Sequence, residues 1–115
     1  MIQRQANARL KQGANNPYYV KDAYTKYTEA INLKPKDPAL LAKLHCNRAM
    51  INLKFKNFGK VIDDCKLSLK ADPTYVKAYY RMGKAYISLK KYKECIDLLS
   101  NQNDPDLKTV LKEAV

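Results

Sequence analysis

The chain has 115 residues, of which 46% are hydrophobic, so it is long enough to fold as one domain and too apolar for a disordered segment. Its net charge of +11, from 22 basic and 11 acidic residues, indicates an anionic partner: a nucleic acid, a membrane surface or an acidic peptide. No apolar run approaches the roughly 18 residues that span a bilayer, so we expect no membrane helix.

Proline residues divide the chain into segments with helical periodicity. The first helix is predicted within residues 1–14, and the second ends at Pro35. Residues 61–72 form a later helix before Pro73, with apolar residues spaced three and four apart. Another helical segment runs from about residue 77 to residue 99. No alternating strand pattern is present, so the pattern predicts an all-α fold.

Two small residues mark an internal repeat, because Ala49 and Gly83 lie 34 residues apart in matching helices. The corresponding residue of the first unit is Ala6, which lies 43 residues before Ala49. We expect the nine extra residues in turns, about five within residues 15–19 and four within residues 37–40. The last segment begins with an N-cap aspartate, Asp104, followed by a first-turn proline, and predicts a final helix.

Five of the nine tyrosines are expected in the core. The five at predicted helix-packing positions are Tyr24, Tyr27, Tyr79, Tyr86 and Tyr92.

The cysteines and the single histidine give no sign of a metal site. There is no CxxC spacing among Cys46, Cys65 and Cys95, and His45 has no histidine partner. Cys65 and Cys95 occupy positions that favour small apolar residues, so we expect core thiols. An odd number of cysteines without a signal peptide is typical of a reducing compartment and predicts a cytoplasmic protein.

Catalytic patterns are also missing from the sequence. The chain has only three glycines and no glycine-rich phosphate loop, and one histidine cannot supply a meaningful Ser-His-acid order. Asp63 and Asp64 are adjacent, but neighbouring helix residues point apart, so we expect a solvent-facing pair. We therefore predict no enzyme, no catalytic residues, no cofactor and no metal.

This pattern of helices resembles the tetratricopeptide repeat, a unit of about 34 residues that folds as two antiparallel helices. The resemblance implies three repeats and a C-terminal capping helix in a right-handed superhelical α-solenoid. The implied boundaries are about 1–35, 40–73 and 74–103 for the repeats and about 105–115 for the capping helix. It also implies that the first helix of each repeat lines a concave groove.

Four polar residues would meet near one end of that groove. Lys77 and Arg81 lie four residues apart, on one face of a helix, while Asn47 and Asn7 come from the preceding two repeats. Lysine and arginine form charge-assisted hydrogen bonds with carboxylates, and asparagine adds donors without charge. The arrangement predicts capture of a peptide's C-terminal carboxylate.

These residues resemble the dicarboxylate clamp of heat-shock co-chaperones. The resemblance implies binding of the acidic C-terminal tail, Glu-Glu-Val-Asp, of chaperones of the 90-kDa or 70-kDa class, with no nucleic acid or membrane as a partner. One clamp lysine of the family is replaced here by Gln3, with Arg4 beside it. The further residues that we consider for groove contacts are Gln3, Arg4, Lys11, Met50, Lys54, Tyr80 and Lys84.

Two alternatives stay open at this point. A tetratricopeptide-repeat scaffold could bind another protein without clamping a carboxylate, or the positive charge could serve a nucleic acid, although no nucleic-acid module is visible. Loss of binding when a peptide's C-terminus is amidated would distinguish the clamp. Arg48 is expected to pack between helices away from the groove, and His45 is expected to be a packing or surface residue.

Overall fold

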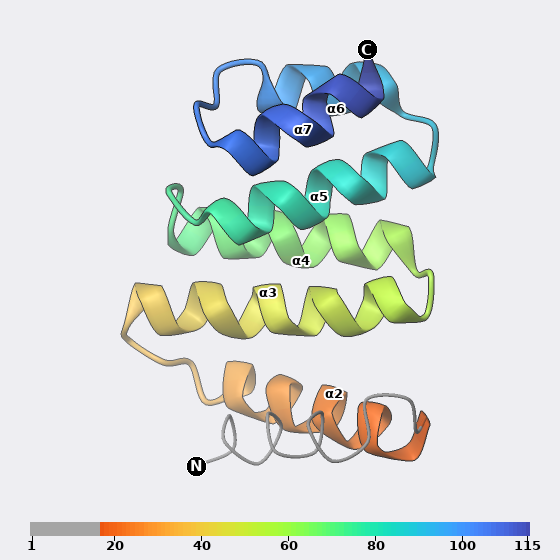
Figure 1. The fold of residues 1–115 in the computed structure, drawn as a ribbon. Coiled ribbons are helices and arrows are strands. Elements are labelled where there is room, and N and C mark those ends of the chain that lie inside the picture. Colours follow the sequence, from red (N-terminus) through yellow and green to blue (C-terminus); the bar gives the residue numbers. More distant parts are fainter. Residues whose placement is uncertain (1–16) are drawn as a thin grey trace.

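A computed structural model of the chain describes residues 17–115, which form six α-helices and contain no strand. The helices are α2 (Pro17–Asn32), α3 (Pro38–Lys54), α4 (Phe58–Ala71), α5 (Val76–Ser88), α6 (Tyr92–Leu99) and α7 (Pro105–Ala114). Figure 1 shows them stacked in chain order, each helix running roughly antiparallel to the one before it up to α6. The all-α solenoid predicted from the sequence is confirmed.

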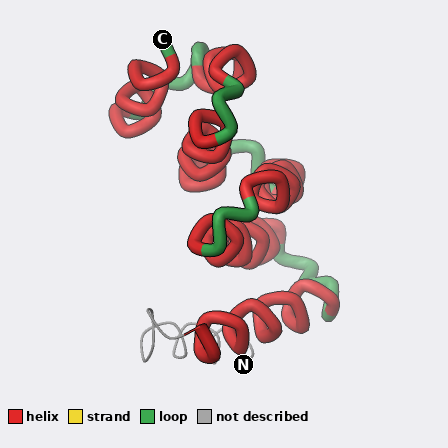
Figure 2. The backbone as a smooth tube through the Cα atoms, turned by 90° about the vertical axis from the view of Figure 1, so that its right-hand side faces the viewer, coloured by secondary structure: helices red, strands yellow, loops and turns green. Residues whose placement is uncertain are grey.

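Helix α5 occupies a central place in this stack. It contacts its chain neighbours α4 and α6, and it also contacts α3 and α7. Figure 2 shows why, since consecutive helices alternate between two sides of the stack and α3, α5 and α7 lie on the same side. A side chain on the exposed face of α5 therefore lies between two neighbouring helices, α3 and α7.

Aspartate and proline fix the starts of α3 and α7. The Asp37 carboxylate accepts a hydrogen bond from the Ala39 amide at 3.0 Å, and Pro38 occupies the first helical position. Asp104 accepts from the amides of the second and third residues of α7, as the sequence predicted. The capping helix is thereby anchored at the end that lies beside α5.

The two turns predicted for the extra residues are wrong where the structure describes them. Residues 17–19 belong to α2, and residues 38–40 belong to α3, which is 17 residues long. A proline lacks the N–H that a first-turn residue would leave unpaired, so Pro17 and Pro38 begin helices instead of extending turns. Part of the extra length therefore lengthens helices.

Lysines with a left-handed backbone conformation lie just after the ends of α3 and α5. Lys56 and Lys90 have φ angles of 60° and 59°, a conformation that usually requires glycine. After α5, the amide of Lys91 donates to the Tyr86 carbonyl at 2.8 Å and that of Lys90 to the Ile87 carbonyl at 2.9 Å. This Schellman pattern satisfies the last carbonyls of the helix, at the cost of a strained lysine backbone.

Replacing Lys90 with glycine is expected to stabilise the protein. The side chain is exposed, so little contact is lost, and relief of the left-handed strain should exceed the added entropy of the unfolded glycine by about 0.5–1 kcal/mol. Urea unfolding followed by circular dichroism measures the difference. A lower midpoint for Lys90→Gly than for the wild type would contradict this account of the helix end.

The core consists of three contiguous clusters between successive helices. Cys46, Cys65 and Cys95 are each fully buried and unpaired, which confirms the prediction of core thiols for Cys65 and Cys95. Of the five tyrosines predicted in the core, Tyr27 is buried and three are half-buried. Tyr92 is 42% exposed, so its prediction is wrong; it begins α6, where a side chain has no preceding turn to pack against.

Gly83 allows α5 to approach the C-terminal helices closely. A Cβ atom at this position would lie 3.0 Å from Leu99 and 3.1 Å from Val110, which belong to α6 and α7. The small residue that marked the repeat in the sequence therefore marks the point where three helices meet. This contact fixes α7 against α5 and so positions the residues described next.

Candidate functional site

Lys77 and Arg81 lie together on the groove side of α5. Both line a hollow of about 240 Å³, whose other walls are Val76, Tyr80 and Asp106. Lys77 is exposed and Arg81 is half-buried, so one cation is free to move and the other is held. The helical spacing of four residues places them one turn apart, as predicted. The hollow therefore presents two positive charges to an approaching ligand.

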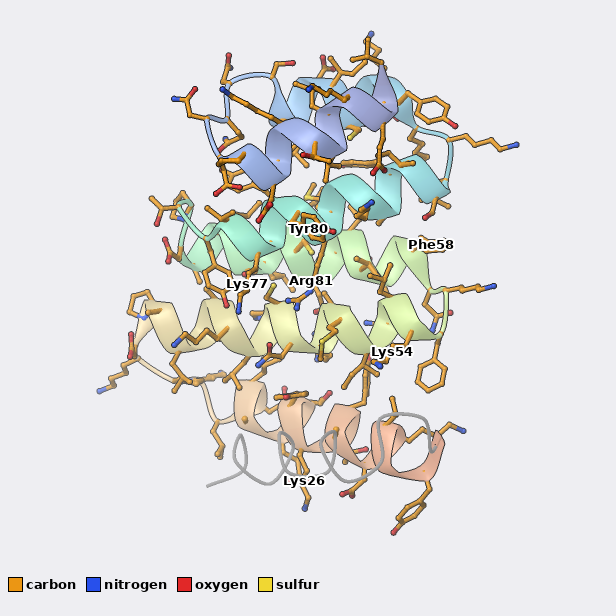
Figure 3. The ribbon with its side chains drawn as sticks, in the orientation of Figure 1. Lys26, Lys54, Phe58, Lys77, Tyr80 and Arg81 are labelled. Atoms are coloured by element: carbon orange, nitrogen blue, oxygen red, sulfur yellow. The ribbon has the colours of Figure 1, made fainter. Side chains whose placement is uncertain are left out.

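Arg81 is fixed by the neighbouring helix α3. One guanidinium nitrogen, Nη1, donates to the Cys46 carbonyl oxygen at 3.1 Å and lies 2.7 Å from the Cys46 Sγ. Figure 3 shows Arg81 pointing from α5 toward α3, with Lys77 to its left and Tyr80 above it on the same helix. A guanidinium has five N–H donors, so contact with α3 orients the group and leaves donors for a ligand.

The Cys46 thiol does not neutralise this arginine. Burial raises the pKa of Cys46 above its ordinary value, although the positive charges of Arg81 and Lys77 act in the opposite direction. The thiol is therefore neutral at physiological pH, because a thiolate would need a higher pH than usual to form. No thiolate therefore lies beside Arg81 to compete with an anionic ligand.

The structure places the remaining predicted residues at different points. Asn47, directly after Cys46, and Met50 are half-buried on α3. Tyr80 is 40% exposed and lines the hollow. Lys54 ends α3 at the far side of the stack from Lys77 (Figure 3). The predicted groove residues Asn7, Gln3, Arg4 and Lys11 lie outside the described residues.

Lys84 forms an ion pair with Glu113 of the capping helix α7. Its Nζ atom lies 3.0 and 3.1 Å from the two carboxylate oxygens of Glu113 on α7 and 5.9 Å from the centre of the Tyr80 ring. A ligand that used Lys84 would have to share it with Glu113. This ion pair also holds the C-terminal half of α7 against α5.

Asp106 is a residue of the hollow that the sequence did not reveal. It is exposed in the first turn of α7, where the helix dipole favours an acidic residue whatever lies opposite. Only the packing of α7 along α5 places this carboxylate in the same hollow as Lys77 and Arg81. Its negative charge opposes theirs.

Arg48 and Asp64 form a buried ion pair that joins three helices. Arg48 Nη2 lies 2.6 Å from Asp64 Oδ1, and Arg48 Nε lies 3.1 Å from both oxygens. Asn52 donates to the same carboxylate at 3.2 Å, and Arg48 Nη1 donates to the Thr28 hydroxyl of α2 at 3.4 Å. Arg48 therefore packs between helices as predicted.

The prediction that Asp63 and Asp64 both face solvent is half wrong. Asp63 is exposed, whereas Asp64 is 4% exposed. Burial by itself would raise the pKa of Asp64, but the neighbouring His45 and the Arg48 guanidinium outweigh it and lower that pKa below its ordinary 3.8. His45 is buried, and its Nδ1 atom lies 3.5 Å from the Oδ1 atom of Asp64. His45 is therefore a packing residue.

Comparison with known proteins identifies the repeat. The family model described as "Tetratricopeptide repeat" matches residues 76–100, which include α5 and α6. The Hsp70/Hsp90 co-chaperone cns1 of Schizosaccharomyces pombe is 43% identical over 98 residues, covering 81% of this chain and 27% of that protein. The chain thus spans about a quarter of the length of this relative.

Two solved structures resemble the whole described fold. The structure of "Hsp90 co-chaperone Cns1 from Saccharomyces cerevisiae" has a TM-score of 0.85 at 26% identity and covers 98% of this chain and 36% of its own. The "First TPR of Spaghetti (RPAP3) bound to HSP90 peptide SRMEEVD" has a TM-score of 0.78 at 25% identity, and the match covers 98% of this chain and 89% of that chain.

Among the described residues, no helix is long and apolar enough to cross a membrane.

Proposed function

We propose that this chain, a tetratricopeptide-repeat domain of the kind found in heat-shock co-chaperones, binds the acidic C-terminal tail of chaperones of the 90-kDa or 70-kDa class. It would act as an adaptor in the cytoplasm, where its three free cysteines would stay reduced. The helices would pair into repeats that end near residues 35, 73 and 103, followed by a capping helix from about residue 105. The related Spaghetti (RPAP3) domain was solved with such a tail, SRMEEVD.

The observation that supports this function most is the hollow on α5. A chain that ends in aspartate carries two carboxylates close together, and Lys77 and Arg81 are two cations one helical turn apart in one hollow. Each charge-assisted hydrogen bond contributes roughly 1.5–3 kcal/mol when it is shielded from water. Arg81 is already oriented by its bond to α3, so binding would order mainly Lys77.

Asparagine side chains would complete the clamp. Asn47 follows Cys46, whose carbonyl binds Arg81, so its amide is carried by the same turn of α3 as the contact that fixes the guanidinium. Asn7 would supply the second amide from the first repeat, and Gln3 or Arg4 would stand where the related clamps have a lysine. Met50 would contact an apolar side chain upstream of the acidic residues.

A calorimetric titration with the peptide SRMEEVD tests the proposal. Binding with a dissociation constant in the micromolar range, about −8 kcal/mol, is expected at low salt. The affinity should fall as salt is added, because the contacts are ionic. The absence of any binding heat at low salt, together with an unshifted melting temperature, would reject the proposed function.

Replacing Asp106 with asparagine is expected to strengthen tail binding. The aspartate lies in the hollow with Lys77 and Arg81, so its charge repels a bound carboxylate. Because the site is open to water, the gain should be modest, about twofold to threefold at low salt. A calorimetric titration of Asp106→Asn with SRMEEVD measures the change in affinity. Weaker binding than in the wild type would show that Asp106 favours binding of the peptide instead.

The exposed Asp97 on α6 provides the matched control for this variant. Asp97→Asn makes the same change in net charge without altering the hollow, so an equal gain in both variants would assign the effect to the overall charge.

A further inference from the structure

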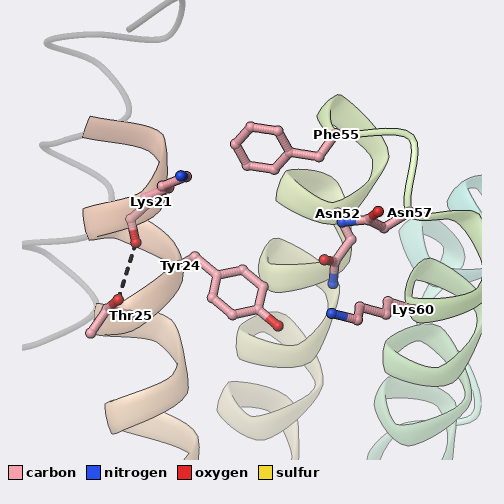
Figure 4. Close-up of a pocket in the computed structure, with 7 residues that line it drawn as sticks. All are labelled: Lys21, Tyr24, Thr25, Asn52, Phe55, Asn57 and Lys60. Carbon is pink, nitrogen blue, oxygen red and sulfur yellow. Dashed lines mark hydrogen bonds between the residues drawn. The ribbon is translucent and has the colours of Figure 1, made fainter. Parts of the chain in front are cut away.

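A second hollow lies at the C-terminal end of α3, on the opposite side of the helix stack from Lys77. It has a volume of about 320 Å³, is open to solvent and is lined by α2, the end of α3 and the start of α4. Figure 4 shows its walls, with the α2 residues facing those of α3 and α4 across the space. The residues that line it are Lys21, Tyr24, Thr25, Asn52, Phe55, Asn57 and Lys60.

The charge of this hollow is positive and unopposed within its walls. Lys21 on α2 and Lys60 on α4 approach it from opposite sides, and no aspartate or glutamate is among the described residues that line it. The buried Asp64 beneath it is already bound by Arg48 and by Asn52. An anion in the hollow would therefore meet two ammonium groups and no competing carboxylate.

The first turn of α4 adds donors to the same place. Asn57 precedes the helix, but its side chain makes no capping hydrogen bond, so the amides of the first turn lack the usual side-chain acceptor. These amides and the positive end of the helix dipole favour an anion.

Two aromatic rings stand beside the cations. Phe55 is 42% exposed although it is a large apolar side chain, and Tyr24 projects its hydroxyl into the space toward Lys60 (Figure 4). The turn that carries Phe55 is rigid, because the Asn57 amide donates to the Asn52 carbonyl at 2.9 Å. The hollow thus offers an apolar ring and a concentration of hydrogen-bond donors side by side.

We propose that this hollow binds an aryl phosphate, the side chain of a phosphotyrosine in a partner protein. The phosphate would lie at the start of α4 between Lys21 and Lys60, where its three oxygens accept from ammonium and backbone donors. The phenyl ring would contact Phe55, which would gain burial and stacking. This site is independent of the proposed carboxylate-binding function and lies at the other end of α3.

Phenyl phosphate, the side-chain analogue, is the probe. In ¹⁵N–¹H NMR titrations of the whole chain, we expect saturable shifts of the Gly59 and Lys60 amides and of residues 21–25. The affinity should be about tenfold lower in Lys21→Gln/Lys60→Gln. Lys66→Gln, which makes the same charge change as Lys21→Gln or Lys60→Gln alone at an exposed site on α4, should bind as the wild type does. Both lysines of the hollow are exposed, so each single variant should fold and bind more weakly.

Further probes separate the sources of the signal. Inorganic phosphate should bind more weakly than phenyl phosphate, and uncharged p-cresol should not saturate. The inference would be overturned by shifts confined to residues 76–81, by equal losses in Lys66→Gln and the double variant, or by equal affinities for inorganic phosphate and phenyl phosphate.

Discussion

Replacing Lys77 with alanine is expected to weaken binding of SRMEEVD at least tenfold, about 1.4 kcal/mol. The lysine is exposed, so the substitution removes a charge from the hollow without removing a buried group. Calorimetry at low salt measures the change. An affinity equal to that of the wild type, with the melting temperature preserved, would place the binding site away from this hollow.

Arg81 is expected to matter at least as much, but its variant is harder to interpret. Arg81→Ala leaves the Cys46 carbonyl without this donor and removes a half-buried side chain, so lost affinity would mix binding with stability. Lys93→Ala, at an exposed lysine of α6, is the control for net charge. It should change the affinity less than twofold, because its charge is screened from the hollow by solvent and salt.

Replacing Asp64 with alanine is expected to destabilise the fold by about 3–5 kcal/mol, because it leaves Arg48 as an uncompensated, partly buried charge. It also removes the acceptor for Asn52. Such a loss is a large part of the roughly 5–15 kcal/mol that stabilise a domain. Thermal and urea unfolding should show it directly. A stability change below 1 kcal/mol would contradict the importance assigned to this ion pair.

The adjacent residue supplies a matched control. Asp63→Ala makes the same chemical change at an exposed position of the same helix and should alter stability by no more than about 0.5 kcal/mol. If Asp64→Ala fails to fold, Asp64→Asn retains the shape of the side chain and allows the loss to be measured.

The ion pair also predicts a dependence on pH. The folded pKa of Asp64 lies below its ordinary 3.8, so its contribution is fully present above that pH and is lost as the pH falls through the folded pKa. The stability difference between the wild type and Asp64→Asn should therefore shrink as the pH falls below about 3.8. A stability difference that grew as the pH fell would contradict this account of the Asp64 carboxylate.

Local signals allowed much of the fold to be predicted. The Asp-Pro pairs at Asp37 and Asp104 begin helices because each cap bonds to amides only two or three residues away. The repeat spacing from Ala49 to Gly83 likewise reflects helix packing. These features depend on neighbours in the chain or on a regular period, which a single sequence displays.

The contacts that the sequence did not reveal have partners that are distant in the chain. Asp64 was expected in solvent because its own helix says nothing of Arg48, which lies 16 residues earlier on α3. For Lys84, a predicted groove residue, the sequence did not reveal the ion pair with Glu113 of α7, and Asp106 enters the hollow only through the same packing. The pairing of α5 with α7 decides all the contacts at this end, and no local pattern encodes it.

We expect the hollow on α5 to contribute to binding the free C-terminal carboxylate of a peptide. The most direct measurement compares SRMEEVD with the same peptide amidated at its C-terminus, titrated under identical low-salt conditions. We predict that the amide binds at least tenfold more weakly, because it removes one of the two carboxylates that Lys77 and Arg81 would hold. Equal affinities for the two peptides would contradict a carboxylate clamp.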